Sequence, residues 1–260
     1  MGQVVTLEKD GPVARVTLRR PEVHNAFNEE VIRLLTEAFT VLRDDFSVRV
    51  ILVQGEGPTF CAGADLDWMR RAASWGEEEN RHDAMALATM LRLVATSPQP
   101  VLARVQGHAL GGGAGLVAAC DLAIASETAQ FAFTEVRLGL VPATVSPYVI
   151  QKVGPAWALR LFLTGERISA QQAQAIGLIY RVVPPQELDQ AVDESISALL
   201  AGGPQAQRLC KELVRRVAIE PSAQIDLYTS HLIAQLRASP EGQEGIRAFL
   251  EKRPPSWRHV

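Results

Sequence analysis

Short apolar runs and amphipathic stretches alternate along the first half of the chain. Residues 4–18 alternate in polarity on either side of Asp10-Gly11, which predicts a β-hairpin. Asn28 predicts a helix N-cap, and the apolar positions after it recur at helical spacing as far as Asp44. An apolar run at residues 48–53 predicts a buried strand. Strand, helix and strand in this order are typical of α/β proteins.

The middle of the chain continues this alternation with one interruption. The stretch from Trp68 to Asn80 lacks a clean apolar period and predicts a mobile segment. It leads into a helix predicted at about residues 82–96. Two further apolar runs predict buried strands at residues 101–105 and 122–125.

From Ser146 onward the chain is predicted to be almost entirely helical, with glycine and proline between the segments. The predicted helices cover residues 147–153, 155–163, 170–176, 186–201, 205–217, 222–236 and 242–252. The last three carry apolar side chains with few partners of their own, and such faces need to be covered. These side chains are Leu209, Leu213, Val214, Ile225, Leu227, Leu232, Ile233 and Leu236. We therefore divide the chain into a core of residues 1–200 and a helical region of residues 201–260.

Three consecutive glycines, Gly111 to Gly113, separate the apolar strand at 101–105 from a small-residue helix that ends near Cys120-Asp121. Glycine costs backbone entropy, so a run of three needs a steric reason. One reason is the approach of a negative oxygen to free N–H groups at a helix N-terminus. The spacing does not match the phosphate-binding motifs. An oxyanion formed during a reaction and simple clearance between helix and strand both remain possible readings.

A second strand and a lone carboxylate offer partners for this turn. The apolar residues 50–53 lead into a glycine-punctuated loop that ends at Asp65, before another helix start. Glu135 lies in largely apolar surroundings, and burial there would raise its pKa toward neutrality and suit it to proton transfer. The alternative is a surface glutamate beside Arg137.

These stretches together resemble the crotonase superfamily of enoyl-CoA hydratases and isomerases. The matching segments are Phe60-Cys-Ala-Gly-Ala-Asp65, Gly107-His-Ala-Leu-Gly-Gly-Gly113, Cys120-Asp121, Phe133-Thr-Glu135, Leu138-Gly-Leu140, Leu163-Thr-Gly165, Ile168-Ser-Ala170 and Gly177-Leu178. Their order and separations match from about Val13 to the C-terminus. The resemblance implies an α/β fold with a ββα spiral core and a C-terminal helical region that forms trimers, often paired into hexamers.

The resemblance also implies a substrate and a site. The substrate is an acyl-CoA thioester, whose oxygen would be held by the backbone N–H groups of Ala64 and Gly112, with Glu135 as the acid and base. No cofactor is expected, because coenzyme A is part of the substrate. By the same correspondence, the residues expected to contact substrate are Ala62, Asp65, Leu66, His108, Gly111, Gly115 and Ala143.

One position departs from the pattern of the family's hydratases. Many of them carry a second glutamate on the helix after the glycines, where this chain has Gly115. Single-glutamate relatives include double-bond isomerases, so this position argues against a standard hydratase. The segment Leu138-Gly-Leu-Val-Pro-Ala-Thr-Val-Ser-Pro-Tyr-Val149 instead resembles bacterial 3-methylglutaconyl-CoA hydratases of leucine degradation.

We give this second resemblance more weight and predict reversible hydration of 3-methylglutaconyl-CoA to 3-hydroxy-3-methylglutaryl-CoA. The alternatives are a single-base enoyl-CoA isomerase and a degenerate acyl-CoA-binding protein. Should the reaction need a second group, the candidates are an ordered water, a residue between Trp75 and Asp83, or the substrate's own carboxylate. Arg137, Ser146 and His108 are possible partners for that carboxylate.

Composition and charge limit the partners, the compartment and the bound metals that can be expected. The 260 residues carry a net charge of −3 with dispersed basic residues, which gives no reason to expect nucleic acid as a partner. No apolar run is long enough to span a membrane, and the first residues show no signal peptide. The three cysteines form no C-x-x-C pair, which argues against a zinc site and a disulfide framework, and we predict a cytoplasmic protein with no bound metal.

Overall fold

A six-stranded sheet carries the fold in the computed structural model, which describes residues 4–218 and 222–259. Its order is β1-β2-β3-β4-β6-β9, and β1 and β2 form the predicted antiparallel hairpin while the other neighbours are parallel. The strands are β1 (Val5–Asp10), β2 (Val13–Leu18), β3 (Val50–Gly55), β4 (Val101–Val105), β6 (Leu122–Ser126) and β9 (Arg181–Val183). This parallel core confirms the α/β layout expected from the alternating pattern.

A smaller sheet of three short strands lies beyond the end of β4. It has the order β5-β7-β8, with β5 (Ala109–Leu110) parallel to β7 (Gln130–Ala132) and β7 antiparallel to β8 (Ile168–Ser169). The chain passes from β4 into β5 through Gln106, Gly107 and His108, and β5 leads directly into the glycine-rich turn that begins at Gly111. Strands of two or three residues carry too little pattern to be found from sequence.

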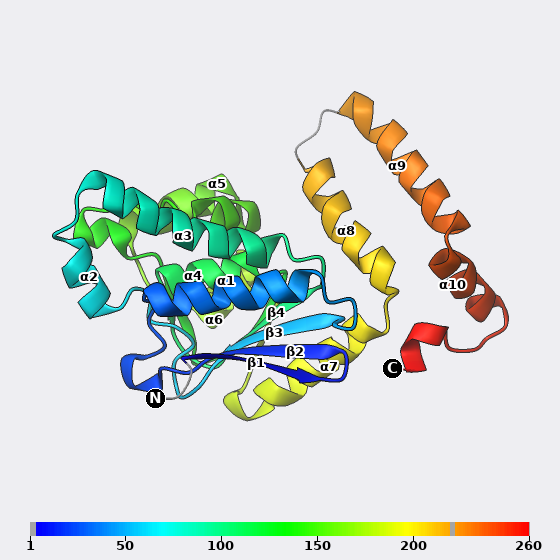
Figure 1. The fold of residues 1–260 in the computed structure, drawn as a ribbon, viewed down its shortest axis with the longest axis horizontal. Coiled ribbons are helices and arrows are strands. Elements are labelled where there is room, and N and C mark those ends of the chain that lie inside the picture. The colour runs from blue at the N-terminus through cyan, green and yellow to red at the C-terminus, as the bar shows by residue number, and fades with distance from the viewer. Residues whose placement is uncertain (1–3, 219–221, 260) are drawn as a thin grey trace.

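Helices lie on both faces of the main sheet (Figure 1). The α-helices of the described residues are α1 (Glu29–Arg43), α2 (Leu66–Ala72), α3 (Glu77–Ala95), α4 (Gly112–Ala119), α5 (Ser146–Thr164), α6 (Ala170–Ala175), α7 (Leu188–Leu200), α8 (Pro204–Val217), α9 (Ser222–Ala238) and α10 (Pro240–Leu250).

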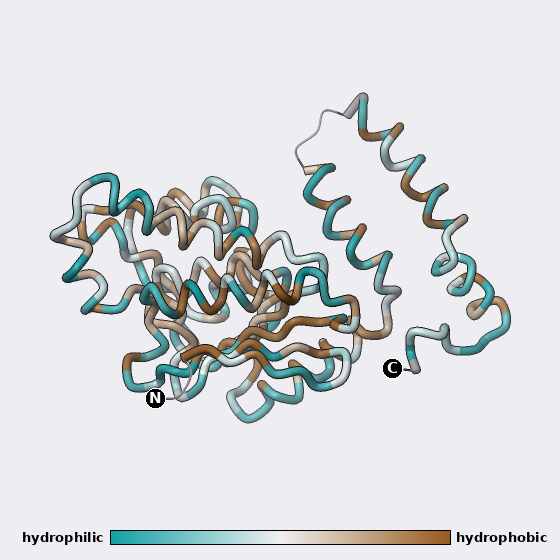
Figure 2. Tube along the Cα trace, viewed as in Figure 1, coloured by the Kyte–Doolittle hydropathy of each residue, from teal (hydrophilic) through white to brown (hydrophobic). Residues whose placement is uncertain are grey.

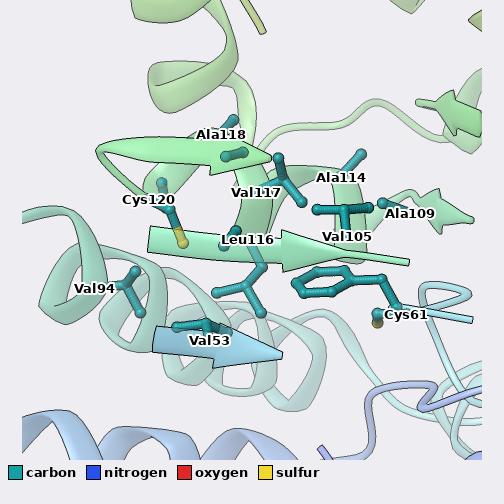
Figure 3. Packing of buried hydrophobic residues seen from close by; sticks show 14 of the residues in the cluster. Val53, Cys61, Val94, Val105, Ala109, Ala114, Leu116, Val117, Ala118 and Cys120 are labelled. Atoms are coloured by element: carbon teal, nitrogen blue, oxygen red, sulfur yellow. The ribbon is translucent and has the colours of Figure 1, made fainter. Parts of the chain in front are cut away.

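Alternate side chains of the central strands serve two separate cores. Ile51 and Val53 of β3 face a large core with α1, α3, α4 and α5, whereas Val50 and Leu52 pack against α7. Figure 2 shows the most hydrophobic stretches of the chain in these strands. Figure 3 shows α4 inside the large core, with Leu116 and Val117 among side chains from β3, β4 and α3. The helix that follows the glycines is therefore held on all sides by the core.

The prediction of a mobile segment at residues 68–80 is wrong. α2 occupies residues 66–72, and α3 begins at Glu77 rather than at about residue 82. Asp65 caps α2 by accepting hydrogen bonds from the N–H groups of Asp67 and Trp68, and Trp68 is buried. The N-cap and one buried tryptophan therefore stabilise α2, although its sequence has no clean apolar period.

The C-terminal helices agree with the predicted segments, and α5 is broken at Gly154 (φ 76°), between the two helices expected there. α8 is tied to the core by Lys211, whose Nζ lies 2.5 Å from Asp121 Oδ2 and 2.8 Å from the carbonyl oxygen of Gln99. α9 and α10 project away from the sheets (Figure 1). The division predicted between residues 200 and 201 falls at the end of α7 and remains a prediction. No helix in the described part of the chain has the length and apolarity needed to cross a bilayer.

The N-cap of α1 offers a test of this local reading. Asn28 Oδ1 accepts a hydrogen bond of 3.0 Å from the N–H of Val31, as predicted. Replacing a capping side chain by alanine costs about 1 kcal/mol, which in a domain of this size lowers Tm by roughly 2–4 °C. We expect this loss for Asn28→Ala by differential scanning calorimetry, and little loss for Asn28→Ser. An equal loss in both variants would contradict the capping role.

Candidate active site

The glycine-rich turn presents a free amide and also solves a packing problem. Gly111 has φ 49°, a conformation that favours glycine, and its N–H donates to the carbonyl oxygen of Ala132. Gly112 begins α4, and within the described residues its N–H donates no hydrogen bond, as expected for the first N–H of a helix. A Cβ on Gly113 would lie 2.4 Å from the carbonyl oxygen of Cys61. Both readings of the glycines therefore apply, clearance at Gly113 and an available donor at Gly112.

The second turn presents the amide of Ala64. Gly63 has φ 96°, and a single parallel bridge joins Phe27 to Ala64. In this bridge Phe27 bonds to the carbonyl oxygen of Gly63 and to the N–H of Asp65, so the N–H of Ala64 points away from Phe27. That N–H has no partner among the described residues, and Ala64 is exposed. It is available to a ligand.

An ion pair that the sequence does not reveal fixes this second turn. Arg20 Nη2 donates to Asp65 Oδ2 at 2.8 Å, while Arg20 Nη1 donates to the carbonyl oxygen of Ala26. Burial alone would raise the pKa of Asp65, but hydrogen bonds from Trp68, Arg20 and Asp67 hold it below its ordinary value. Asp65, expected to contact substrate, is buried and serves as the cap of α2 and the partner of Arg20.

Glu135 lies where the two turns come close together. It begins a short 3-10 helix, Glu135–Leu138, after β7. A Cβ added to Gly111 would lie 3.5 Å from Glu135 Oε1 and 3.9 Å from the Cα of Gly63. The two glycine turns and the carboxylate, far apart in sequence, therefore come together at one spot. A Cβ on Gly63 would lie 3.0 Å from the carbonyl oxygen of Leu110, and the positive φ of Gly63 and Gly111 favours glycine at both positions.

Burial of Glu135 changes its acidity. Its Oε2 is buried and has no hydrogen-bond partner among the described residues. Burial raises the pKa of Glu135 above its ordinary value, although its own backbone N–H acts in the opposite direction. A carboxyl group of this kind is suited to take up and return a proton, whereas the alternative of a surface glutamate paired with Arg137 does not fit these surroundings.

Val145 occupies the space beside Gly115, the position at which many of the family's hydratases carry a second glutamate. A Cβ on Gly115 would lie 2.1 Å from Cγ1 of Val145, far inside van der Waals contact. Val145 is buried, and it directly precedes α5. Glu135 is thus the carboxylate that the structure places at the meeting point of the two turns.

The other predicted contact residues differ in exposure and hydrogen bonding, and their contact with substrate stays a prediction. Leu66 and Ala143 are exposed, and Ala62 donates its N–H to the carbonyl oxygen of His24. His108 lies in the turn between β4 and β5, with a buried Nδ1 that lacks a partner among the described residues. Ser146 donates to the carbonyl oxygen of Ala143. Four large apolar side chains close in sequence to Asp65 or Glu135 are exposed; they are Leu66, Leu138, Leu140 and Val141.

Three further observations concern nucleophiles, cavities and metal ligands. Cys61 lies next to the second turn, but it is buried and burial raises its pKa to about 12, which excludes a thiolate nucleophile near neutral pH. A groove between α1 and α3 is lined by Ile32, Trp75 and Met85, among others, and by none of the residues of the meeting point. No group of three potential metal ligands occurs in the described ranges.

The raised pKa of Glu135 predicts an unusual dependence of stability on pH. Because the folded state disfavours the ionised carboxylate, Glu135 reduces the free energy of unfolding as pH rises above its ordinary pKa of about 4.5. We therefore expect Glu135→Gln to raise Tm relative to the native protein at pH 7–8, with the gain disappearing at pH 4.

The matched control is Glu8→Gln, which removes an exposed glutamate and is expected to give no gain. Thermal unfolding of the three proteins across this pH range checks the prediction. A loss of stability in Glu135→Gln at pH 8 would show that the ionised carboxylate has a stabilising partner.

Comparison with known proteins agrees with this geometry. The Enoyl-CoA hydratase/isomerase family matches residues 8–259. An enoyl-CoA hydratase from Shewanella pealeana is 38% identical and superposes with a TM-score of 0.94 over 98% of this chain and 96% of that one. Crotonyl-CoA hydratase of Syntrophomonas wolfei is 33% identical, over 96% of this chain and 95% of that protein.

An isomerase occurs among the relatives as well. Trans-2-decenoyl-acyl-carrier-protein isomerase of Streptococcus mutans is 28% identical over 95% of this chain and 95% of that protein. The likeness to solved structures confirms the predicted crotonase-like α/β fold. The chain belongs to the enoyl-CoA hydratase/isomerase family, within the crotonase superfamily.

Proposed function

We propose that this protein catalyses the reversible hydration of a branched enoyl-CoA, with 3-methylglutaconyl-CoA and 3-hydroxy-3-methylglutaryl-CoA as the reacting pair. One observation carries the proposal: two glycine turns, each followed by a backbone N–H without a partner among the described residues, lie against Glu135, whose Oε2 is buried and unpaired. The choice of acyl group rests on the resemblance of residues 138–149 described above. The pathway that this pair implies is leucine degradation.

The mechanism follows from the positions of these groups. The N–H groups of Ala64 and Gly112 donate to the thioester oxygen and stabilise the enolate; a single donor of this kind contributes about 3–4 kcal/mol. In the dehydration direction, Glu135 removes the proton at C2 and the electron pair forms the enolate. The hydroxyl at C3 then accepts the proton from Glu135 and leaves as water, while the C2–C3 double bond forms.

Glu135 performs both proton transfers in this scheme. Its raised pKa is consistent with two roles, because the group has to accept a proton from carbon and return it to oxygen. A second polar group, where the reaction uses one, would be an ordered water or the terminal carboxylate of the substrate itself.

Removal of the Glu135 carboxylate tests the mechanism. We expect Glu135→Gln to lower kcat for 3-methylglutaconyl-CoA by about 10²–10⁴-fold while CoA-ester binding remains near normal, because proton transfer is lost and the amides are retained. Stopped-flow absorbance and calorimetric titration measure the two quantities. Crotonyl-CoA, assayed beside it, reports whether the enzyme requires the branched acyl group. Native kcat in Glu135→Gln would remove Glu135 from the mechanism.

An isomerase is the second candidate. It is favoured by the single carboxylate, because one base is enough to move a proton between two carbons, and by the isomerase among the relatives. Incubation in H₂¹⁸O separates the two reactions. A hydratase introduces the label at C3, whereas an isomerase shifts the double bond without taking up label. A degenerate acyl-CoA-binding protein would bind the esters and turn over none of them.

We also propose that the chain assembles as a trimer or a dimer of trimers. α9 and α10 project from the core (Figure 1), and they expose large apolar side chains, among them Leu227, Phe249 and Leu250. Faces of this kind mark an interaction surface. Light scattering after gel filtration is expected to give three or six times the chain mass of 28.3 kDa. Phe249→Asp should lower that mass, and Val41→Asp, an exposed residue of α1, should leave it unchanged.

The proposed compartment is the cytoplasm. Cys61, Cys120 and Cys210 are all free thiols in the structure, and free thiols are retained in reducing compartments.

A further inference from the structure

We propose that Val145 determines the single-carboxylate character of this site, by occupying the volume that a side chain at position 115 would need. The inference extends the proposed function, and it assigns a specificity-determining role to a residue outside the two turns and Glu135. It makes positions 115 and 145 a coupled pair, in which only one of the two can carry a side chain.

The contact distances carry the argument. A Cβ at Gly115 would lie 2.1 Å from Cγ1 of Val145 and 2.6 Å from its Cβ, but 3.7 Å from its Cα. The last distance is ordinary van der Waals contact. Glycine at position 145 would therefore admit a side chain at position 115, whereas alanine would still clash through its Cβ.

Neither residue is free to move aside. Gly115 is buried in α4, which the large core surrounds. Val145 is 1% exposed, and its carbonyl oxygen accepts hydrogen bonds from Tyr148 and Val149 in the first turn of α5. Interiors packed this densely do not absorb an added methyl group without strain.

A glutamate side chain at position 115 would point toward the reacting groups, so the packing at positions 115 and 145 affects the chemistry. Residues 112 and 115 are three apart on α4 and share one face of the helix. Helical side chains tilt toward the N-terminus, so a glutamate at position 115 would extend toward Gly112 and the meeting point with Glu135. Val145 fills the beginning of that path with an apolar branched side chain. Substrate is thus faced by one carboxylate and an apolar wall, and Glu135 has to carry out both proton transfers.

Stability measurements test the coupling without reference to activity. We expect Gly115→Ala to lower Tm by about 5 °C through overpacking. Val145→Gly should relieve this loss, so that the double variant is more stable than the sum of the single effects requires. Val145→Ala should relieve it much less, because of the clash with its Cβ.

Val149→Gly provides the matched control. Val149 is also buried, near the start of α5, but it is not among the nearest neighbours of a Cβ at position 115. Its effect should add to that of Gly115→Ala without relief. A neutral Gly115→Ala, or equal relief by Val149→Gly, would overturn the proposal.

Activity measurements test the consequence. Gly115→Glu combined with Val145→Gly should raise kcat for crotonyl-CoA hydration at least about tenfold over Val145→Gly alone, because a second acid–base group then reaches the site. The gain should depend on the carboxylate and be absent when Gln replaces Glu at position 115. A folded double variant with no gain over Val145→Gly would overturn the assigned role.

The stability and activity measurements together distinguish a failure of this inference from a failure of the proposed function. If the native protein turns over no acyl-CoA, the proposed function fails while the stability coupling between positions 115 and 145 stands on its own. If the native protein is a hydratase and the coupling is absent, the inference fails and the proposed function stands.

Discussion

The site depends on the contact between two stretches of bare backbone, at Gly63 and Gly111. Each residue has a positive φ, and a Cβ on either would lie within 4 Å of the Cα of the other. This approach brings the amides of the following residues, Ala64 and Gly112, to the same region as Glu135. The positive φ at both positions would put any other residue under backbone strain. The chemistry of the site thus begins with the absence of side chains at two positions.

The surrounding structure supports this contact from several directions. Arg20 and Asp65 fix one turn through an ion pair, and the packed position of α4 in the large core fixes the other. The cost of the arrangement falls on Glu135, whose Oε2 is buried without a partner. A polar group left unpaired in the interior is unfavourable, and in a native protein it calls for an explanation such as catalysis. The rest of the fold therefore supplies the stability that this one group reduces.

Much of this arrangement can be predicted from the sequence, because it is encoded locally. The two glycine turns follow apolar strands, Asn28 is a recognisable cap, and the motifs around Ala64, Gly112 and Glu135 keep the order and spacing of the family. The convergence of the turns cannot be predicted from spacing alone, since it depends on a sheet order in which β4 lies between β3 and β6.

Other features escape sequence reasoning for specific physical reasons. The helix start after Asp65 is predicted, but the extent of α2 is not, because this short helix relies on its cap and on buried Trp68 and has no apolar period. The ion pair between Arg20 and Asp65 joins residues 45 positions apart. Likewise, the clash that a side chain at position 115 would make with Val145 depends on the packing of α4 against α5. The cap of α2 and the ion pair with Arg20 occupy the carboxylate of Asp65, and its expected contact with substrate stays a prediction.

The most direct test of the account is the state of the thioester carbonyl in the bound substrate. Isotope-edited infrared spectroscopy of a ¹³C-labelled thioester bound to the protein reports the strength of hydrogen bonding to that oxygen. If the amides of Ala64 and Gly112 both donate to it, the carbonyl stretch is displaced to lower frequency on binding, relative to the same ester in water. A carbonyl band at its solution frequency, with the ester bound, would contradict the claim that the two turns form an oxyanion hole.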